Sequence, residues 1–312
     1  MKTEAYRGQK KKKSFFWHMK KNWQLYVLLA PTIIYLLLFN YLPIVGVQIA
    51  FRDYTAIGGI WNSKWVGLKH FAKFFSSIQF GTLLGNTIKI SVYSLLWGFP
   101  MPIILAIMLN ECGSARLKKG VQMLTYAPHF ISTVVLVSML NLFLDVDTGI
   151  INKIIELFGG TASNLIGNEK AFRTIYIASG IWQGCGWSSI IYIAALAGVD
   201  SQLYEAAKID GANRLQKVWY IDLPSILPTI LTLFILDCGN ILNVGYEKVY
   251  LMQNTLNQSV SEVISTYVYK LGLLGGQFSY TTAIGLFNSV VNIIVLAMVN
   301  QISKKVNEVS LF

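Results

Sequence analysis

Six long apolar stretches constrain the fold of this 312-residue chain more than any other feature of its sequence. Each holds enough residues to cross about 30 Å of hydrocarbon at roughly 1.5 Å per residue. The stretches are residues 25–47, 84–109, 121–144, 175–199, 226–244 and 283–302. Because backbone groups in lipid must be hydrogen-bonded within their own segment, helices are expected. The sequence therefore predicts an all-α, polytopic membrane protein with six transmembrane helices.

The composition also favours a membrane protein over an ordinary soluble domain. Hydrophobic residues make up 54% of the chain and charged residues only 13%, which is too apolar for a typical soluble protein. The first apolar stretch follows a basic start, as in a signal peptide, but it is too long for one and no small-residue cleavage site follows it. We therefore interpret it as a permanent span.

Lysine and arginine gather on one side of the predicted topology. They precede the first stretch and follow the even-numbered ones, so the positive-inside rule makes these segments cytoplasmic. The basic residues concerned are Lys2, Arg7, Lys10 to Lys13, Lys20, Lys21, Arg116, Lys118, Lys119, Lys208, Arg214, Lys217, Lys304 and Lys305. Both termini are expected inside. The predicted organisation is a basic tail at 1–24, a membrane domain at 25–302 and a cytoplasmic tail at 303–312.

The net charge of +11 raises the possibility of a nucleic-acid partner. Most of the excess, however, lies beside the ends of the apolar stretches, where lysine and arginine fix topology and attract anionic lipid. Membrane lipid is therefore the expected partner, and no nucleic acid is expected. The three cysteines, Cys112, Cys185 and Cys238, form no CxxC pattern and predict no disulfide.

The sequence lacks the patterns that catalysis or metal binding requires. It contains no Gly-Lys dipeptide, and hence no GxxxxGK[ST] phosphate loop that would bind ATP. The histidines His18, His70 and His129 are scattered without metal-ligand spacing, and His129 is interpreted as a hydrogen-bonded helix residue. Without a nucleophile–base or metal constellation, no catalytic residue, metal or cofactor is expected, and the chain is not predicted to be an enzyme.

Polar residues inside the apolar stretches, with Glu247 just beyond the fifth, mark a candidate substrate path. A charge at the centre of a span costs about 2.5–3.5 kcal/mol on insertion scales, so Asp237 should face the bundle interior or water. A structural hydrogen bond to a neighbouring helix is an equal alternative for it. Aromatic rings and amides suit passage of a carbohydrate, although helix–helix contacts use the same residue types. The candidate residues are Trp182, Trp187, Tyr192, Asp237, Asn240, Asn243 and Glu247.

An alanine-rich polar segment, residues 203–224, interrupts the apolar pattern. Leu203, Ala206 and Ala207 have helical spacing, and so do Ala212, Leu215 and Trp219, which predicts two short amphipathic helices. Gly211 lies between them and can adopt the positive φ that a corner needs. The exposed apolar face needs a partner. Spacing alone leaves two alternatives, a docking element for another protein or helices on the inner leaflet anchored by Tyr204, Trp219 and Tyr220.

The motif in this segment is specific. Glu205-Ala206-Ala207, then Gly211, Ile221 and Leu223-Pro224, stand at the spacing of the EAA signature, and the segment resembles that signature of permease subunits in bacterial ABC importers. We call residues 203–224 the EAA segment. The whole chain further resembles carbohydrate-uptake permeases of the LplB type, including those for alginate and pectin-derived oligosaccharides. The matching stretches begin at Tyr41, Trp65, Tyr126 and Thr282 and read YLPI, WVGLKHF, YAPHFIS and TAIGLF.

The resemblance implies a type I ABC importer permease fold in the bacterial cell membrane. It implies as partners a second homologous permease subunit, two cytoplasmic ABC ATPase subunits that bind the ATP, and an extracytoplasmic solute-binding protein that delivers the carbohydrate. In that family the EAA helix docks in a groove on the ATPase. The residues assigned to ATPase coupling are Glu205, Ala206, Ala207, Asp210, Gly211, Ala212, Leu223 and Pro224.

Two alternatives to a sugar importer follow from the same residues. The first is an ABC importer permease for a non-sugar solute. The second is an ion-coupled secondary transporter, which would be expected to carry broken hydrophobic segments in two halves and paired ionisable residues inside the membrane. Asp237 alone is clearly placed at mid-span, which disfavours the second alternative.

Overall fold

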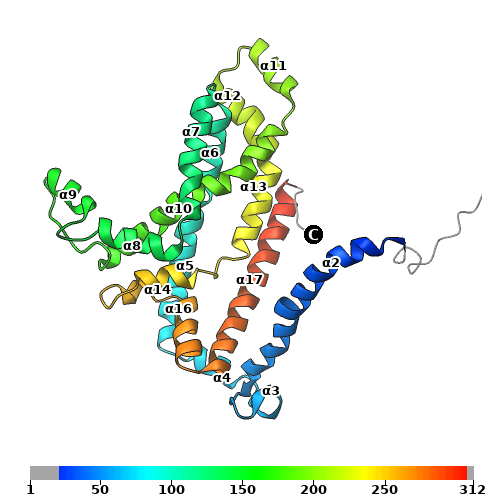
Figure 1. Cartoon of the computed structure of the whole chain (residues 1–312), viewed down its shortest axis with the longest axis vertical. Coiled ribbons are helices and arrows are strands. Elements are labelled where there is room, and N and C mark those ends of the chain that lie inside the picture. Colours follow the sequence, from blue (N-terminus) through cyan, green and yellow to red (C-terminus); the bar gives the residue numbers. More distant parts are fainter. Residues whose placement is uncertain (1–20, 308–312) are drawn as a thin grey trace, which may run out of the picture.

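Long helices form an elongated bundle in the computed structural model, which describes residues 21–307 (Figure 1). In chain order the longer helical segments are α2 (Trp23–Leu36) with η1 (Leu37–Tyr41) and η2 (Leu42–Phe51), α5 (Gln79–Gly98) with α6 (Pro100–Asn110), α7 (Ala115–Tyr126) with η3 (Ala127–Phe130), α8 (Thr133–Phe143), α10 (Glu169–Ala197), α12 (Arg214–Lys217) with η4 (Val218–Asp222) and α13 (Leu223–Cys238), and α17 (Phe278–Asn307). The predicted all-α class is confirmed.

Shorter elements connect these helices. They are β1 (Arg52–Asp53), α3 (Gly59–Asn62), β2 (Lys64–Trp65), α4 (Lys69–Phe75), α9 (Ile150–Leu157), α11 (Ser201–Ile209), α14 (Tyr246–Met252), α15 (Gln258–Ser261), α16 (Ile264–Val268) and η5 (Tyr269–Leu274). The two short strands pair antiparallel, with Arg52 opposite Trp65. Together with α3 and α4 they form a packed cap, in which the rings of Phe51 and Trp65 stack 5.6 Å apart.

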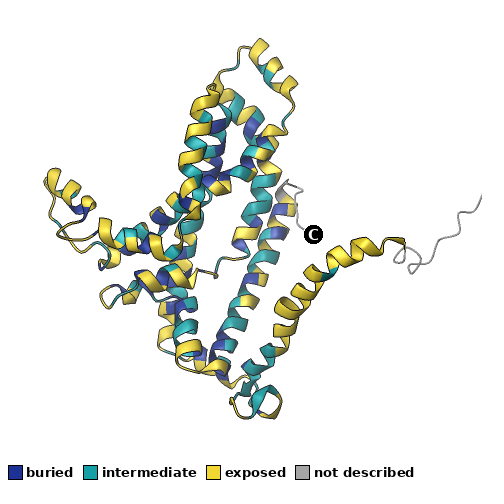
Figure 2. Ribbon diagram, viewed as in Figure 1, coloured by how far each residue is buried: buried dark blue, intermediate teal, exposed yellow. Residues whose placement is uncertain are grey.

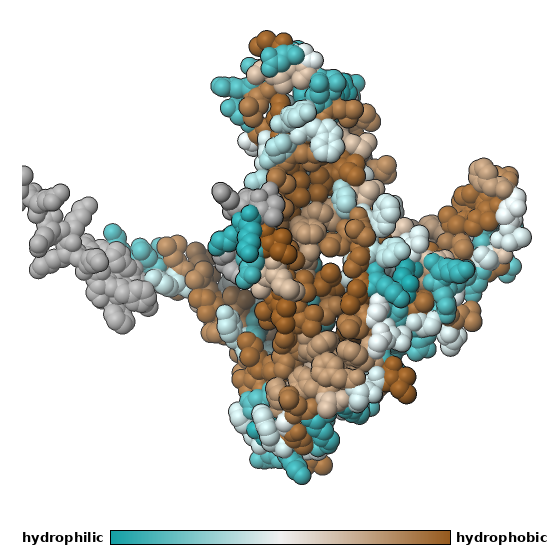
Figure 3. Space-filling view, turned by 180° about the vertical axis from the view of Figure 1, so that it is seen from behind, coloured by the Kyte–Doolittle hydropathy of each residue, from teal (hydrophilic) through white to brown (hydrophobic). Residues whose placement is uncertain are grey.

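Within residues 21–307, four continuous helices are long and apolar enough to cross a membrane. They are Trp23–Phe51, Gln79–Asn110, Arg214–Cys238 and Phe278–Lys305, and they correspond to the first, second, fifth and sixth apolar stretches. The fourth stretch forms α10, which is 29 residues long but is not one of those four. On the face shown in Figure 3, hydrophobic residues cover most of the central column, and hydrophilic residues gather at its two ends and along the projecting arm. This distribution is that of a polytopic membrane protein.

The third apolar stretch is not one straight span, and this prediction needs correction. Its two parts, Ala115–Phe130 and Thr133–Phe143, are bent by 102°. Pro128 cannot donate a backbone hydrogen bond, so the first helix weakens there. Ser132 then starts a new helix, because its hydroxyl accepts a hydrogen bond from the backbone N–H of Val135 at 3.3 Å. Four or five helices therefore meet the length and composition of a span among residues 21–307, depending on whether this pair counts as one.

The fifth apolar stretch also has different limits from those predicted. Its helix begins at Arg214, inside the EAA segment, and ends at Cys238, short of residue 244. A side chain at Gly239 would come within 2.7 Å of Leu296 on α17, so glycine permits the close approach of the two helices at this point. The second helix of the EAA segment is consequently not a short one. It continues through η4 into α13.

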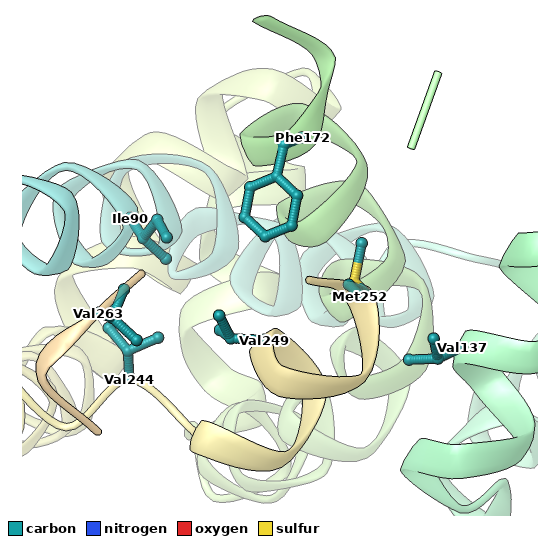
Figure 4. Close-up of a cluster of buried hydrophobic side chains, with 7 residues drawn as sticks. All are labelled: Ile90, Val137, Phe172, Val244, Val249, Met252 and Val263. Carbon is teal, nitrogen blue, oxygen red and sulfur yellow. The ribbon is translucent and has the colours of Figure 1, made fainter. Parts of the chain in front are cut away.

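In the part of the chain that the structure describes, three clusters of buried side chains hold the bundle together. Figure 4 shows the first, to which α5, α8, α10 and α14 contribute, together with the connections around residues 244 and 263. A second cluster joins α4 and α5 to α16 and α17. The third joins α6, α10 and α13 through Ile103, Tyr192 and Ile226. Helix α10 thus packs along α6 and reaches α5, α7 and α13.

The first helix is the exception to this packing. Within Trp23–Leu36 no residue is buried, and α2 diverges from the other helices (Figures 1 and 2). Only its continuation η2 packs along α17. The predicted basic tail at 1–24 lies largely outside the described residues, and α17 runs on to Asn307, five residues beyond the predicted end of the membrane domain at 302.

Candidate functional site

A cavity of about 750 Å³ lies between α5, α6, α10 and α13. It brings together five of the seven residues predicted for the substrate path, namely Trp187, Tyr192, Asp237, Asn240 and Asn243. Further lining comes from hydroxyl and apolar side chains, including Ser91, Ser94, Phe99, Pro102, Tyr176, Ser188, Ile191 and Leu233. The cavity wall therefore combines aromatic rings, hydroxyls, amides and one carboxyl group.

The other two predicted path residues lie elsewhere. Trp182 is on α10 but outside the cavity lining, with an exposed fraction of 49%. Glu247 is in the first turn of α14 and is exposed. Glu247 follows Asp237 by ten residues in the sequence, a spacing that would put the two on one stripe only along a continuous helix. Because α13 ends at Cys238, that spacing no longer places Glu247 on the same face.

One wall of the cavity is formed by backbone that is not helical. Residues 239–245 leave the helix, and Asn240, Asn243 and Gly245 line the cavity. Irregular backbone at membrane depth is tolerated where it lines an aqueous cavity or is buried in protein. Here α17 supplies hydrogen bonds. The amide oxygen of Asn292 accepts from the backbone N–H of Leu242 at 3.1 Å, and its Nδ2 donates to Oδ1 of Asn243, also at 3.1 Å.

Asn288 completes this amide cluster and was missed by the sequence reasoning. Its Nδ2 donates to Oδ1 of Asn243 at 2.9 Å. Asn288 and Asn292 are four residues apart in the apolar sixth stretch, and so lie on one face of α17. That spacing was a signal for a polar contact. The partner in that contact, Asn243, could not be found without knowing that α13 ends beside α17.

The aromatic part of the cavity is ordered by stacking. His129 of η3 lies parallel to Trp187 of α10, with ring centroids 4.5 Å apart and an interplanar angle of 2°. Phe130 meets the same indole edge-on at 5.8 Å. The sequence predicts a hydrogen-bonded helix residue at His129, whereas the structure shows a stacked ring. The bend after η3 thus holds an aromatic pair against the cavity-lining face of α10.

The EAA segment forms the end of the molecule farthest from the cap (Figure 1). Asp200 begins α11 by accepting a hydrogen bond from the backbone N–H of Gln202 at 2.9 Å. The corner after α11 has Gly211 at φ 74°, and the backbone N–H of Ala212 donates to the carbonyl of Ala207 at 2.8 Å. The predicted glycine corner is therefore present.

Most of the predicted coupling residues are accessible. Glu205, Ala206, Asp210, Gly211 and Pro224 are exposed, while Ala207, Ala212 and Leu223 are partly buried. The segment presents large apolar side chains as well, because Leu215 is 71% exposed and Ile209 87% exposed. This surface is available to a protein partner.

Tyr204 does not have the position expected of a lipid anchor, which was one of the two alternatives for this segment. Its hydroxyl donates to Oδ1 of Asp222 at 2.5 Å, and Nδ2 of Asn110 donates to the same oxygen at 3.4 Å. Trp219 and Tyr220 remain exposed. Burial of the Tyr204 side chain is the main cause, and its hydrogen bond to Asp222 the second cause, of a pKa raised to about 12. The phenol therefore stays protonated and remains a donor.

Asp222 is wholly buried at the start of α13, and its Oδ2 is buried without a hydrogen-bond partner among the described residues. Beside it, Lys217 and Glu111 form an ion pair of 3.1 Å. Sequence reasoning missed this cluster. An acidic residue within the EAA segment, directly before an apolar helix, was the available signal.

Among residues 21–307, no group of three or more histidine, cysteine, aspartate or glutamate side chains could hold a metal ion. The arrangement offers instead a polar cavity inside an apolar bundle and an exposed docking element at one end. These features define a membrane transport subunit that works with another protein.

The chain belongs to the family described as binding-protein-dependent transport system inner membrane component, which matches residues 98–308. It is thus a multi-pass permease subunit of an ABC importer. It is 48% identical to the polygalacturonan/rhamnogalacturonan transport system permease protein YteP of Bacillus subtilis over 92% of this chain and 90% of that protein. Protein LplB of the same organism is 45% identical over 94% and 92% of the two chains.

Solved structures show the same fold. A chain of a bacterial ABC transporter involved in the import of the acidic polysaccharide alginate matches with a TM-score of 0.86 and 40% identity, over 94% of this chain and 99% of that one. A chain of the bacterial alginate ABC transporter, in complex with the alginate pentasaccharide-bound periplasmic protein, matches with a TM-score of 0.87 and 39% identity, over 96% and 100%. The predicted permease fold is confirmed.

Proposed function

We propose that this permease imports oligosaccharides or fragments of polysaccharides, and that it forms half of a translocation pathway with a second, homologous permease subunit. The observation that carries the proposal is the cavity of about 750 Å³ that gathers Trp187, Tyr192, Asp237, Asn240 and Asn243. Its size lies within the range of about 300–1,000 Å³ typical of sites for small molecules. The polygalacturonan/rhamnogalacturonan permease YteP and the alginate importer named above support the same substrate class.

The lining suits a saccharide in two ways. Aromatic rings at Tyr192 and Trp187 offer flat apolar surfaces to the C–H faces of a sugar ring. The amides of Asn240 and Asn243 both donate and accept hydrogen bonds, as sugar hydroxyls do. Asp237 adds an acceptor when ionised. A substrate that presents hydroxyls around an apolar ring matches this combination.

Other proteins hydrolyse the ATP that drives transport and deliver the saccharide. A solute-binding protein delivers the saccharide on the outer side, and two ABC ATPase subunits bind and hydrolyse ATP on the inner side, where both termini of this chain lie. The exposed helix α11 docks on an ATPase. ATP binding then biases the permease pair towards an outward-open state, and hydrolysis resets it. This chain performs no chemical reaction and holds no cofactor of its own.

The test is transport by the complete importer, reconstituted in vesicles with its partner subunits. We expect labelled oligosaccharide to accumulate when ATP is enclosed on the ATPase side, and substitution of Glu205 or Gly211 to lower both uptake and permease-stimulated ATP hydrolysis. Membrane insertion, measured by extraction with detergent, should be unchanged. Uptake driven by an ion gradient without ATP would instead establish a secondary transporter. Import of a non-sugar solute in place of saccharides would refute the substrate class.

A further inference from the structure

We propose that Tyr204, Asp222 and Asn110 form a clasp that carries the movement of α11 into α6 and α13, and so into the walls of the cavity. The inference rests on the proposed function, because an ATPase must move α11. The three residues act as positioning residues and do not contact the substrate. Their role is to keep the docking helix and the cavity walls moving as one body.

The first argument is how little else joins α11 to the bundle. Of the nine residues in Ser201–Ile209, only Tyr204 and Ala207 are partly buried, and the other seven are exposed. Helix α11 projects from the end of the molecule in Figure 1. A helix tied only by its flanking loops could rotate without moving its neighbours. The hydroxyl of Tyr204 gives it a fixed point on the body of the permease.

The second argument is the chemistry of Asp222. A buried carboxylate is costly unless hydrogen bonds compensate for its lost hydration. Asp222 is 0% exposed, and one of its two oxygens lacks a partner among the described residues. An apolar residue would avoid this cost, so packing alone does not explain an acid here. A charge-assisted bond from a phenol is among the stronger and more directional bonds available to a side chain.

The third argument is where the clasp leads. Asn110 is the last residue of α6, whose Pro102 lines the cavity. Asp222 directly precedes α13, whose Leu233 and Asp237 line another wall. Both helices also meet α10 in the buried cluster that contains Tyr192. One carboxylate oxygen therefore joins the docking helix to two rigid helices that end at the cavity, which is the contiguous packing that mechanical coupling uses.

The experiment uses the complete reconstituted importer and measures the ATP hydrolysed for each oligosaccharide imported. Tyr204→Phe removes the hydroxyl and keeps the ring. We expect uptake to fall about tenfold, the effect of losing one charge-assisted hydrogen bond, while ATP hydrolysis stimulated by the binding protein changes by less than about twofold. The ATP-to-sugar ratio should therefore rise. Asp222→Asn keeps an acceptor without the charge. Its ATP-to-sugar ratio should lie between that of the unmodified protein and that of Tyr204→Phe.

Two further variants separate the clasp from a general effect on the segment. Tyr220→Phe makes the same change at an 80% exposed tyrosine of the same segment, and its ratio should equal that of the unmodified protein. The double variant Tyr204→Phe with Asp222→Asn should be no worse than Tyr204→Phe alone, because both changes act on one bond.

The failures of the two proposals are distinguishable. If Tyr204→Phe keeps the normal ATP-to-sugar ratio while Gly211→Val loses uptake, the clasp is refuted and the importer function stands. If Gly211→Val also transports normally, the assignment of the EAA segment to ATPase coupling is refuted. The proposed function itself is refuted if the unmodified importer takes up no oligosaccharide with ATP. If Tyr204→Phe or Asp222→Asn lowers the amount of assembled complex in detergent, the residues serve folding, and the clasp is again refuted.

Discussion

The EAA segment and the cavity are built in opposite ways. The EAA segment is one continuous stretch, residues 203–224, whose assigned residues are mostly exposed. The cavity is assembled from four helices and from the broken backbone at 239–245, which is held by amides of α17. A site carried by one stretch can be recognised from spacing. A site assembled from distant stretches depends on where each helix ends.

The two regions should also differ in whether substitutions impair transport alone or both transport and folding. Residues of the EAA segment that face outward contribute little to the buried clusters, so their replacement should impair transport more than folding. Residues around the cavity also satisfy backbone groups inside the bundle, so their replacement should affect both. Four substitutions test this contrast.

The largest effect is expected at Gly211. Its φ is 74°, and a side chain there would meet no atom within 4 Å, so the effect of Gly211→Val is backbone strain without a clash. Such strain costs about 1–2 kcal/mol, and more for a β-branched residue. The corner between α11 and α12 should rearrange, and docking should be lost. We expect at least about a tenfold fall in ATP-driven uptake by reconstituted vesicles.

Two glycine variants serve as controls for this prediction. Gly211→Asn should keep most of the uptake, because asparagine tolerates positive φ. Gly113→Val changes a loop glycine that also has open space but no positive φ, and it should transport normally. An equal loss of uptake in Gly211→Val and Gly211→Asn would show that the positive φ at residue 211 is not the cause of the loss.

The second prediction concerns the break in α13. Asn292→Leu leaves the buried backbone N–H of Leu242 without its acceptor at 3.1 Å, which costs about 1–3 kcal/mol. Both the thermal unfolding temperature in detergent and the uptake rate should fall. Ser289→Ala is the matched control, because this exposed hydroxyl donates to the carbonyl of Gly285 one turn earlier. If the unfolding temperature of Asn292→Leu is unchanged, the amides of α17 do not support the break.

Particular residues show how far the sequence predicted these two regions. The spacing of the EAA motif placed the corner at Gly211, and five of the seven path residues do line one cavity. Glu247 was misplaced because periodicity assumes that a helix continues, whereas α13 ends at Cys238. The contacts of Tyr204 with Asp222 and of Asn292 with Leu242 join residues 18 and 50 positions apart. Such contacts follow from tertiary packing, which no local pattern encodes.

A smaller effect is expected from the aromatic side of the cavity. Trp187→Ala removes a cavity-lining ring together with its stacking on His129. An aromatic contact is worth about 0.5–1.5 kcal/mol, so the concentration of oligosaccharide needed for half-maximal uptake should rise about two- to tenfold. Trp182→Ala removes the same type of side chain from the same helix, outside the cavity lining. Equal effects of the two variants would contradict the assignment of this cavity to the substrate.

The smallest effect is expected where the two regions meet, at the ion pair of Lys217 and Glu111. Their nitrogen and oxygen lie 3.1 Å apart, with the side chains 24% and 17% exposed, so water still screens the attraction. Such pairs contribute about 0.2–1 kcal/mol, and Lys217→Gln should lower uptake by less than about fivefold. Adding salt should reduce uptake by the unmodified protein towards that of the variant.

Lys208→Gln removes the same charge from an exposed position on α11 and should have less effect. A larger loss in Lys208→Gln would place the important charge on the docking surface, and the ion pair would then carry none of the coupling.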